Sequence, residues 1–132
     1  MIPLLALTLS GTVTPSGIQN QVPTEFQGRY TLAVGSCGRS GTPQMIIGGR
    51  NIEWFGRDDR VLFSEPIGGG KVHVFLTDSS VARGVKELHF ELQGDRADHL
   101  LILDHLSDAE DVANRGTTIS DKSVVGFFKR CA

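Results

Sequence analysis

Histidine and carboxylate side chains are the residues of this chain whose types could support acid–base chemistry or metal binding. His99 and His105 stand six positions apart in DHLLILDH, so they share one face of an unbroken strand. Such a strand separates them by about 20 Å, too far for one shared metal ion. His89 could approach His99 across a hairpin, with Glu87 or Glu91 alongside. The solvent face of an antiparallel hairpin carries the same residue types, so we predict no catalytic residues, no metal and no cofactor.

Glycine-rich and charged turns offer no stronger signal for chemistry. GSCGRSG does not match the G-x-S-x-G nucleophile pattern, and IGGGK lacks the Ser or Thr and the following helix of a phosphate-binding loop. Glycine accepts the positive φ of tight turns, so both segments are predicted to be turns. GRDDR, at residues 56–60, is interpreted as a charged loop exposed to solvent.

The length and composition indicate one ordinary globular domain. The chain has 132 residues, of which 39% are hydrophobic and 21% charged. Sixteen glycines, most of them between short apolar runs, indicate many turns and therefore many strands. The formal net charge is −2, and basic and acidic residues are intermixed. This pattern gives no basic surface for nucleic acid or for an anionic membrane.

Residues 1–23 are predicted to precede the folded domain, which we place at residues 24–132. Ile2–Leu9 is apolar but too short for an integral membrane segment, which takes about 20 apolar residues. It is typical of the hydrophobic part of a secretory signal peptide, although no Lys or Arg precedes it and no clear cleavage site follows. An N-terminal strand or an ordinary tail is the alternative. A polar, proline-containing linker follows.

Short apolar runs predict about eight antiparallel strands. In the first run, Tyr30, Leu32 and Val34 alternate with residues of the opposite face. The last strand is VVGFFKRC. Three hairpins lie between them, with turns predicted at residues 48–51, 68–70 and 94–96. Their alternation predicts a set of inward-facing residues: Ile52, Trp54, Val72, Val74, Leu76, Leu88, Phe90 and Leu92.

The strand pattern stops between Asp104 and Ser123. Ser107 and Glu110 form a capping box, and Gly116 suits the position just after a helix. We therefore expect one short helix before the last strand.

Consecutive hairpins predict a closed barrel. An eight-stranded meander removes its exposed edges by closing into an up-and-down barrel, with a half-open sandwich as the main alternative. The first and last strands of such a barrel are neighbours, so Cys37 and Cys131 could reach disulfide distance and fasten the seam. In the chain-entropy model, a disulfide that closes so long a loop stabilises the fold by about 4–5 kcal/mol. Disulfides persist in oxidising compartments, so we expect a periplasmic or secreted protein. Two unrelated buried thiols in a cytosolic protein are the alternative.

The first strand also carries a family resemblance. FQGRYTLAVGSC, which begins at Phe26, is similar to the G-x-[WY] opening strand of lipocalin-like (calycin) barrels, here Gly28-Arg29-Tyr30. With FFKRC at the end, residues 24–132 resemble small exported bacterial barrels of that class. Periplasmic lysozyme-inhibitor barrels also link a first-strand cysteine to a C-terminal one. Their S-G-x-x-Y loop is absent here, where TDSSVARGVKEL holds the comparable position without the tyrosine.

Binding is the function that this pattern favours. A closed eight-stranded barrel either fills with side chains or holds one small apolar ligand. We predict a non-enzymatic, exported binding module for a small apolar ligand, lined by Tyr30, Trp54, Val74 and Phe90. The alternative is an inhibitor of a protease or lysozyme partner that acts through an exposed loop at residues 78–84 or 38–43.

Overall fold

The computed structural model describes residues 17–38, 44–54, 57–78, 84–94, 96–104, 110, 112, 116, 118–119 and 124–131. Within these ranges the chain forms a 3-10 turn followed by nine strands. Their bounds are η1 Thr24–Phe26, β1 Gly28–Leu32, β2 Gln44–Ile47, β3 Asn51–Trp54, β4 Arg57–Gly68, β5 Lys71–Asp78, β6 Gly84–Gln93, β7 Arg96–Asp104, β8 Thr118–Ile119 and β9 Val124–Cys131.

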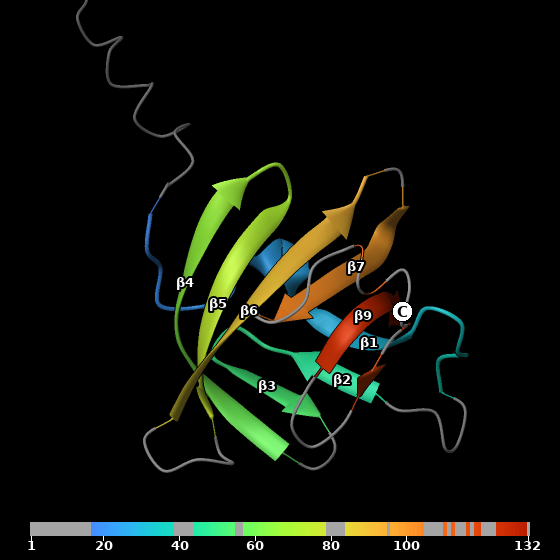
Figure 1. Cartoon of the computed structure of the whole chain (residues 1–132), viewed down its shortest axis with the longest axis horizontal. Helices are drawn as coiled ribbons and strands as arrows, with labels where there is room; N and C mark the ends of the chain where they lie inside the picture. The colour runs from blue at the N-terminus through green and yellow to red at the C-terminus, as the bar shows by residue number, and fades with distance from the viewer. Residues whose placement is uncertain are drawn as a thin grey trace, which may run out of the picture.

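Eight antiparallel strands close into a barrel, which confirms the predicted fold class (Figure 1). Strands β1 to β7 pair in chain order, and β9 pairs with both β7 and β1. The seam joins residues 29–32 of β1 to residues 128–131 of β9. The short strand β8 pairs with Val124 and Val125 at the start of β9. Closure leaves no half-open sandwich.

The turns follow the glycine signals, with one correction in the first strand. Gly68, Gly69 and Gly70 have φ of 82°, 65° and 74°, as the tight β4–β5 turn requires. Val34 continues the alternation of Tyr30 and Leu32 in the sequence, but it is 95% exposed. The strand ends at Leu32, because the chain turns back there through a hydrogen bond from the Gly35 N–H to the Leu32 carbonyl.

One continuous hydrophobic cluster fills the barrel interior. Seven of the eight residues predicted to face inward belong to it, and Leu92 packs against it while partly exposed. The cluster also contains residues contributed by other strands and by the chain before β1, namely Val22, Phe26, Tyr30, Met45, Ile47, Val61, Leu100, Ile102, Val124 and Phe128. The interior at these positions is therefore occupied by side chains.

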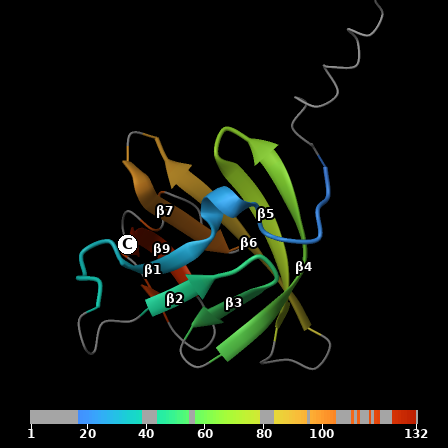
Figure 2. The ribbon, with the colours of Figure 1, turned by 180° about the vertical axis from the view of Figure 1, so that it is seen from behind.

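Residues 17–27, which we call the cap segment, close one end of the barrel. Figure 2 shows η1 lying across this end, with the chain before it running toward β4. Val22 and Phe26 are 0% and 2% exposed because they insert into the core. Part of the segment that we assigned to the linker thus packs against the barrel.

A smaller cluster lies on the outer face of β7 and β9. Leu101, Val112 and Val125 are buried together, with Leu103 and Phe127 packed against them. Glu110 and Val112 have helical backbone, and the Gly116 N–H donates to the Val112 carbonyl. The rest of the helix predicted there lies outside the described residues.

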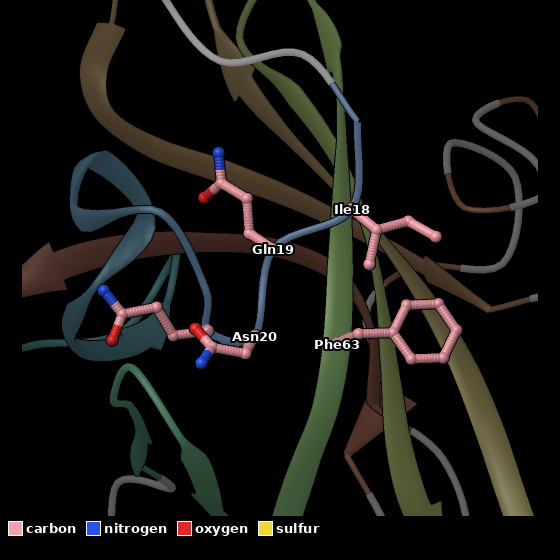
Figure 3. A pocket seen from close by; sticks show the side chains of 5 residues that line it. Ile18, Gln19, Asn20 and Phe63 are labelled. Carbon is pink, nitrogen blue, oxygen red and sulfur yellow. The ribbon is translucent and has the colours of Figure 1, made fainter.

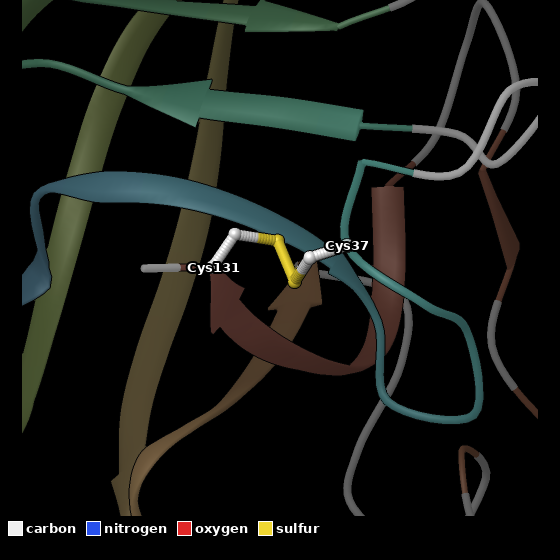
Figure 4. Close-up of a disulfide and its surroundings, with 2 residues drawn as sticks. All are labelled: Cys37 and Cys131. Carbon is white, nitrogen blue, oxygen red and sulfur yellow. A yellow bond between two sulfur atoms is a disulfide. The ribbon is translucent and has the colours of Figure 1, made fainter.

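The predicted disulfide is present, but its position corrects the role we gave it. Cys37 and Cys131 are bonded, with their Cα atoms 5.6 Å apart (Figure 4). Cys37 lies beyond the end of β1, whereas Cys131 is the last residue of β9. Backbone pairing of β1 with β9 already holds the seam, so the bond fastens the loop after β1 to the end of β9.

No helix within the described ranges is both long and apolar enough to cross a bilayer.

Candidate functional site

The four residues predicted to line a ligand site lie together in the barrel core. Tyr30, Trp54, Val74 and Phe90 are each at most 2% exposed and belong to the same buried cluster. The ring of Phe26, from the cap segment, lies 6.2 Å from the ring of Phe90. Side chains occupy the space around these residues, so their role in binding a ligand stays a prediction.

The capped end of the barrel is held by a tyrosine and an arginine. The Tyr30 hydroxyl donates a hydrogen bond of 2.8 Å to the Phe26 carbonyl. Arg130 donates one of 2.8 Å to the Tyr30 hydroxyl and another to the Glu25 carbonyl. The Arg130 guanidinium also lies over the Tyr30 ring, 5.4 Å from its centroid. Arg130 in β9 therefore connects the cap segment to β1.

Burial controls the protonation of this tyrosine. Desolvation raises the pKa of Tyr30 above its ordinary value, while the hydrogen bond and charge of Arg130 act in the opposite direction. The hydroxyl is thus neutral at physiological pH. Only the neutral form can donate to Phe26 while accepting from Arg130.

A hollow opens to solvent between the cap segment and β4. Its volume is about 570 Å³, which lies within the range of small-molecule sites. Figure 3 shows the Ile18 and Phe63 side chains beside each other on one side of β4. Ile18 is 70% exposed, so its side chain is accessible to a ligand in the hollow. The lining residues that the structure describes are uncharged: Ile18, Gln19, Asn20, Gln21 and Phe63.

Hydrogen bonds to one serine position the walls of this hollow. Gln19 and Ser64 exchange two backbone hydrogen bonds of 2.8 Å, as in a short antiparallel bridge. The Ser64 hydroxyl donates to the Gln21 carbonyl at 2.6 Å. The Phe63 ring stacks on Phe75 with centroids 4.4 Å apart, which fixes its orientation. The strand pattern missed this site, because the contact between Gln19 and Ser64 spans distant parts of the sequence.

The opposite end of the barrel carries a buried charged cluster. Asp59 is fully buried, and its carboxylate lies 3.0 Å from Lys86 Nζ and 3.4 Å from Arg57 Nη2. Both cations lie over the Trp54 ring, at 4.6 Å for Lys86 and 5.6 Å for Arg57. The cap segment contacts the β2–β3 turn, where the Gly49 carbonyl accepts a hydrogen bond from the Val22 N–H. Trp54 is at the other end of β3, away from that turn. The two ends of the barrel are therefore closed by different chemistry.

This cluster corrects the interpretation of GRDDR as a solvated loop. Arg57, Asp58, Asp59 and Arg60 are the first residues of β4. Alternation turns Asp59 inward and leaves Asp58 exposed. Val61, two residues further along β4, is also buried. This alternation with a period of two was the signal that could have identified Asp59 as inward-facing.

The histidines are not arranged as the alternative metal or enzyme hypothesis required. His89 pairs in register with Leu103 of β7, whereas His99 pairs with Lys129 of β9. The neighbour of His89 is instead His73, with ring centroids 5.1 Å apart.

Each of these histidines lies beside a carboxylate. His73 Nδ1 is 3.6 Å from Glu87, and His89 Nε2 is 3.3 Å from Glu91. Among the residues that the structure describes, no three His, Cys, Asp or Glu side chains are placed to hold a metal ion. His105 lies outside those residues.

The two loops proposed for an inhibitor, 38–43 and 78–84, lie largely outside the described residues. Comparison with known proteins gave no match to a family model, to a curated protein sequence or to a solved structure.

Proposed function

We propose that this protein is a non-enzymatic binding module that holds a small, uncharged and mainly apolar ligand in the hollow between the cap segment and β4. The observation that carries the proposal is the hollow of about 570 Å³ with exposed Ile18 beside the stacked ring of Phe63. Exposed apolar side chains that gather at a concave surface are typical of ligand-binding sites.

The lining favours one class of ligand. Burying Ile18 and Phe63 under an apolar ligand removes their surface from water, which is worth about 25 cal/mol per Å². The side-chain amides of Gln19, Asn20 and Gln21 can donate and accept hydrogen bonds to a neutral polar group. The described lining residues carry no charge, which favours a neutral ligand over an ionic one.

Three features outside the hollow lining support the proposal of an exported protein related to lipocalin-like barrels. The Cys37–Cys131 disulfide is typical of oxidising compartments, and the apolar segment Ile2–Leu9 is typical of a signal peptide. Tyr30 of the G-x-Y strand sits in a closed eight-stranded barrel, as the resemblance implies. We propose a periplasmic or secreted location on these grounds.

Titration with the neutral fluorescent dye N-phenylnaphthylamine tests the proposal. The oxidised protein should bind the dye, and Ile18→Ser should weaken binding by about tenfold, or 1.4 kcal/mol. Val85→Ser is the matched control, because Val85 is another apolar side chain, 60% exposed, outside the hollow lining. Absence of binding, or equal effects of the two substitutions, would contradict the proposal.

NMR chemical-shift mapping of the same titration distinguishes the hollow from the barrel interior. The largest changes should fall at residues 18–21 and at Phe63 if the dye occupies the hollow. Changes centred on Val74 and Phe90 would instead place the ligand among the residues predicted from the sequence.

A further inference from the structure

We propose that the Cys37–Cys131 disulfide regulates the hollow, because reduction frees the end of β9 and Arg130 then releases the cap segment. The ligand-binding consequence rests on the proposed function. The structural coupling between the disulfide and the cap segment does not rest on the proposed function. An experiment can therefore contradict the coupling without contradicting the ligand site, or the reverse.

The disulfide acts on the least supported part of β9. Pairing with β7 covers Gly126–Lys129, whereas Arg130 and Cys131 pair in register with Tyr30 and Arg29 of β1. Among the described residues, these last two positions thus have one neighbouring strand instead of two. The bond to Cys37 adds a covalent hold at this end.

Arg130 carries the coupling from the strand to the cap. Successive strand residues point to opposite faces, so Cys131 holds β9 from outside the barrel while Arg130 holds the cap. Its guanidinium donates to the Glu25 carbonyl and to the Tyr30 hydroxyl. Its side chain also packs against Gly28, where a Cβ atom would meet Arg130 Nε at 3.1 Å. These contacts depend on the position of β9 beside β1.

The cap contacts lead from Arg130 to the hollow. Phe26 receives the hydrogen bond of Tyr30, and the side-chain amide of Gln27 donates to the Val22 carbonyl at 2.9 Å. The Val22 N–H donates to Gly49 at 2.8 Å. The residues just before Val22 are those that line the hollow. A displaced cap therefore removes one wall of the site.

The reduction needs a dithiol as co-reactant. Cys37 is exposed and Cys131 is nearly buried, so the reductant thiolate attacks Sγ of Cys37 and Cys131 leaves as a thiolate. The second thiol of the reductant then attacks the mixed disulfide and releases Cys37. The protein gains two electrons and two protons, and the dithiol becomes a cyclic disulfide.

Hydrogen exchange of the full chain, oxidised and then reduced with dithiothreitol, tests the coupling. The Val22 amide of the cap donates to the Gly49 carbonyl, and the Ser64 amide of β4 donates to the Gln19 carbonyl of the cap. We expect both amides to exchange about tenfold faster after reduction, as in a local opening. Amides in the middle of β5 and β6 should keep their rates. Faster exchange confined to residues 33–38 would mean that the bond only tethers the loop and would overturn the proposal.

Arg130→Met separates the coupling from the disulfide itself. This variant keeps the disulfide and most of the side-chain length but loses the hydrogen bonds to the Glu25 carbonyl of the cap and to the Tyr30 hydroxyl of β1. In the oxidised state its Val22 amide should exchange as fast as that of the reduced protein, whereas Lys129→Met, its neighbour on β9, should behave as the unsubstituted protein does. Slow exchange in Arg130→Met would overturn the proposal, even if reduction unfolds the whole domain.

Dye titration then connects the coupling to the site. N-phenylnaphthylamine should bind the reduced protein and oxidised Arg130→Met about threefold to tenfold more weakly than the oxidised protein. Equal affinities would overturn the regulatory proposal. Failure of the oxidised protein to bind the dye would contradict the proposed function, while the exchange result would still decide the coupling.

Discussion

The two ends of the barrel are closed in contrasting ways. At the capped end, a separate piece of chain inserts Val22 and Phe26 and is held by hydrogen bonds to backbone carbonyls. At the charged end, side chains of the barrel strands close the interior themselves, with Asp59 placed between Arg57 and Lys86. The cap segment contributes no strand to the barrel sheet, whereas the charged end is closed by residues of the strands themselves.

The charged end should therefore contribute most to stability, whereas the capped end lies beside the proposed ligand site. A fully buried carboxylate is tolerated because two cations compensate it, and loss of one member leaves an uncompensated charge. The cap contacts are individually weaker, since a hydrogen bond in a protein contributes about 0.5–3 kcal/mol net. The proposed ligand site lies beside the weaker end, in agreement with the general finding that binding regions have low local stability.

Among substitutions at the two ends, Asp59→Ala should lower the free energy of unfolding the most. A small effect would contradict the view that the charged end stabilises the barrel. It leaves Lys86 and Arg57 without the buried carboxylate, so the free energy of unfolding should fall by about 3–5 kcal/mol. Urea denaturation of the oxidised protein measures this change. Asp58→Ala is the control, because Asp58 is exposed and accepts a hydrogen bond from Asn51 on the surface. This substitution should lower the free energy of unfolding by less than about 1 kcal/mol.

Tyr30→Phe should have an intermediate effect at the capped end. The substitution keeps the ring in the core but removes the hydroxyl that bonds Phe26 and Arg130. The free energy of unfolding should fall by about 1–2 kcal/mol, and cap amides should exchange faster. A double-mutant cycle with Arg130→Met should give a combined loss smaller than the sum of the two. A strictly additive result would show that Arg130 does not act through Tyr30.

Alkaline pH should change the free energy of unfolding least. It should act on the capped end alone, because the single tyrosine of the chain lies there. The pKa of Tyr30 is raised in the folded state, so the unfolded chain ionises first, near pH 10. The contribution of Tyr30 to stability is therefore constant below that pH and falls as the pH rises toward the folded pKa. Tyr30 is the single tyrosine of the chain, so phenolate absorbance measures it directly. A titration midpoint below that of the urea-unfolded protein would contradict this expectation.

The barrel could be predicted from the sequence because its signals are local and periodic. Val72, Val74 and Leu76 alternate over a run bounded by three glycines, and the structure places all three in the core. Val34 continued the same alternation in the first strand, yet it lies outside, because the chain reverses after Leu32. Periodicity identifies a face but does not show where a strand ends.

The candidate sites could not be predicted in the same way. Asp59 lies in a run of charges that resembles a turn. Its alternation with Val61 marks the inward face, but the ion pair with Lys86 that compensates its buried charge comes from a strand two places away in the sheet. Ile18 lies in a polar segment, and its position beside Phe63 depends on the bridge between Gln19 and Ser64. Both arrangements arise from tertiary contacts between residues far apart in the chain, which carry no short-range pattern.

The seam between β1 and β9 has a consequence for the order of folding. It joins residues 29–32 to residues 128–131, and contacts between such distant segments form late because the loop between them must be closed first. During synthesis, β1 and β7 therefore present unpaired edges until residues 124–131 are available. Unpaired edges promote strand-to-strand aggregation, so a nascent chain of this barrel should depend on protection from association until its last strand is released.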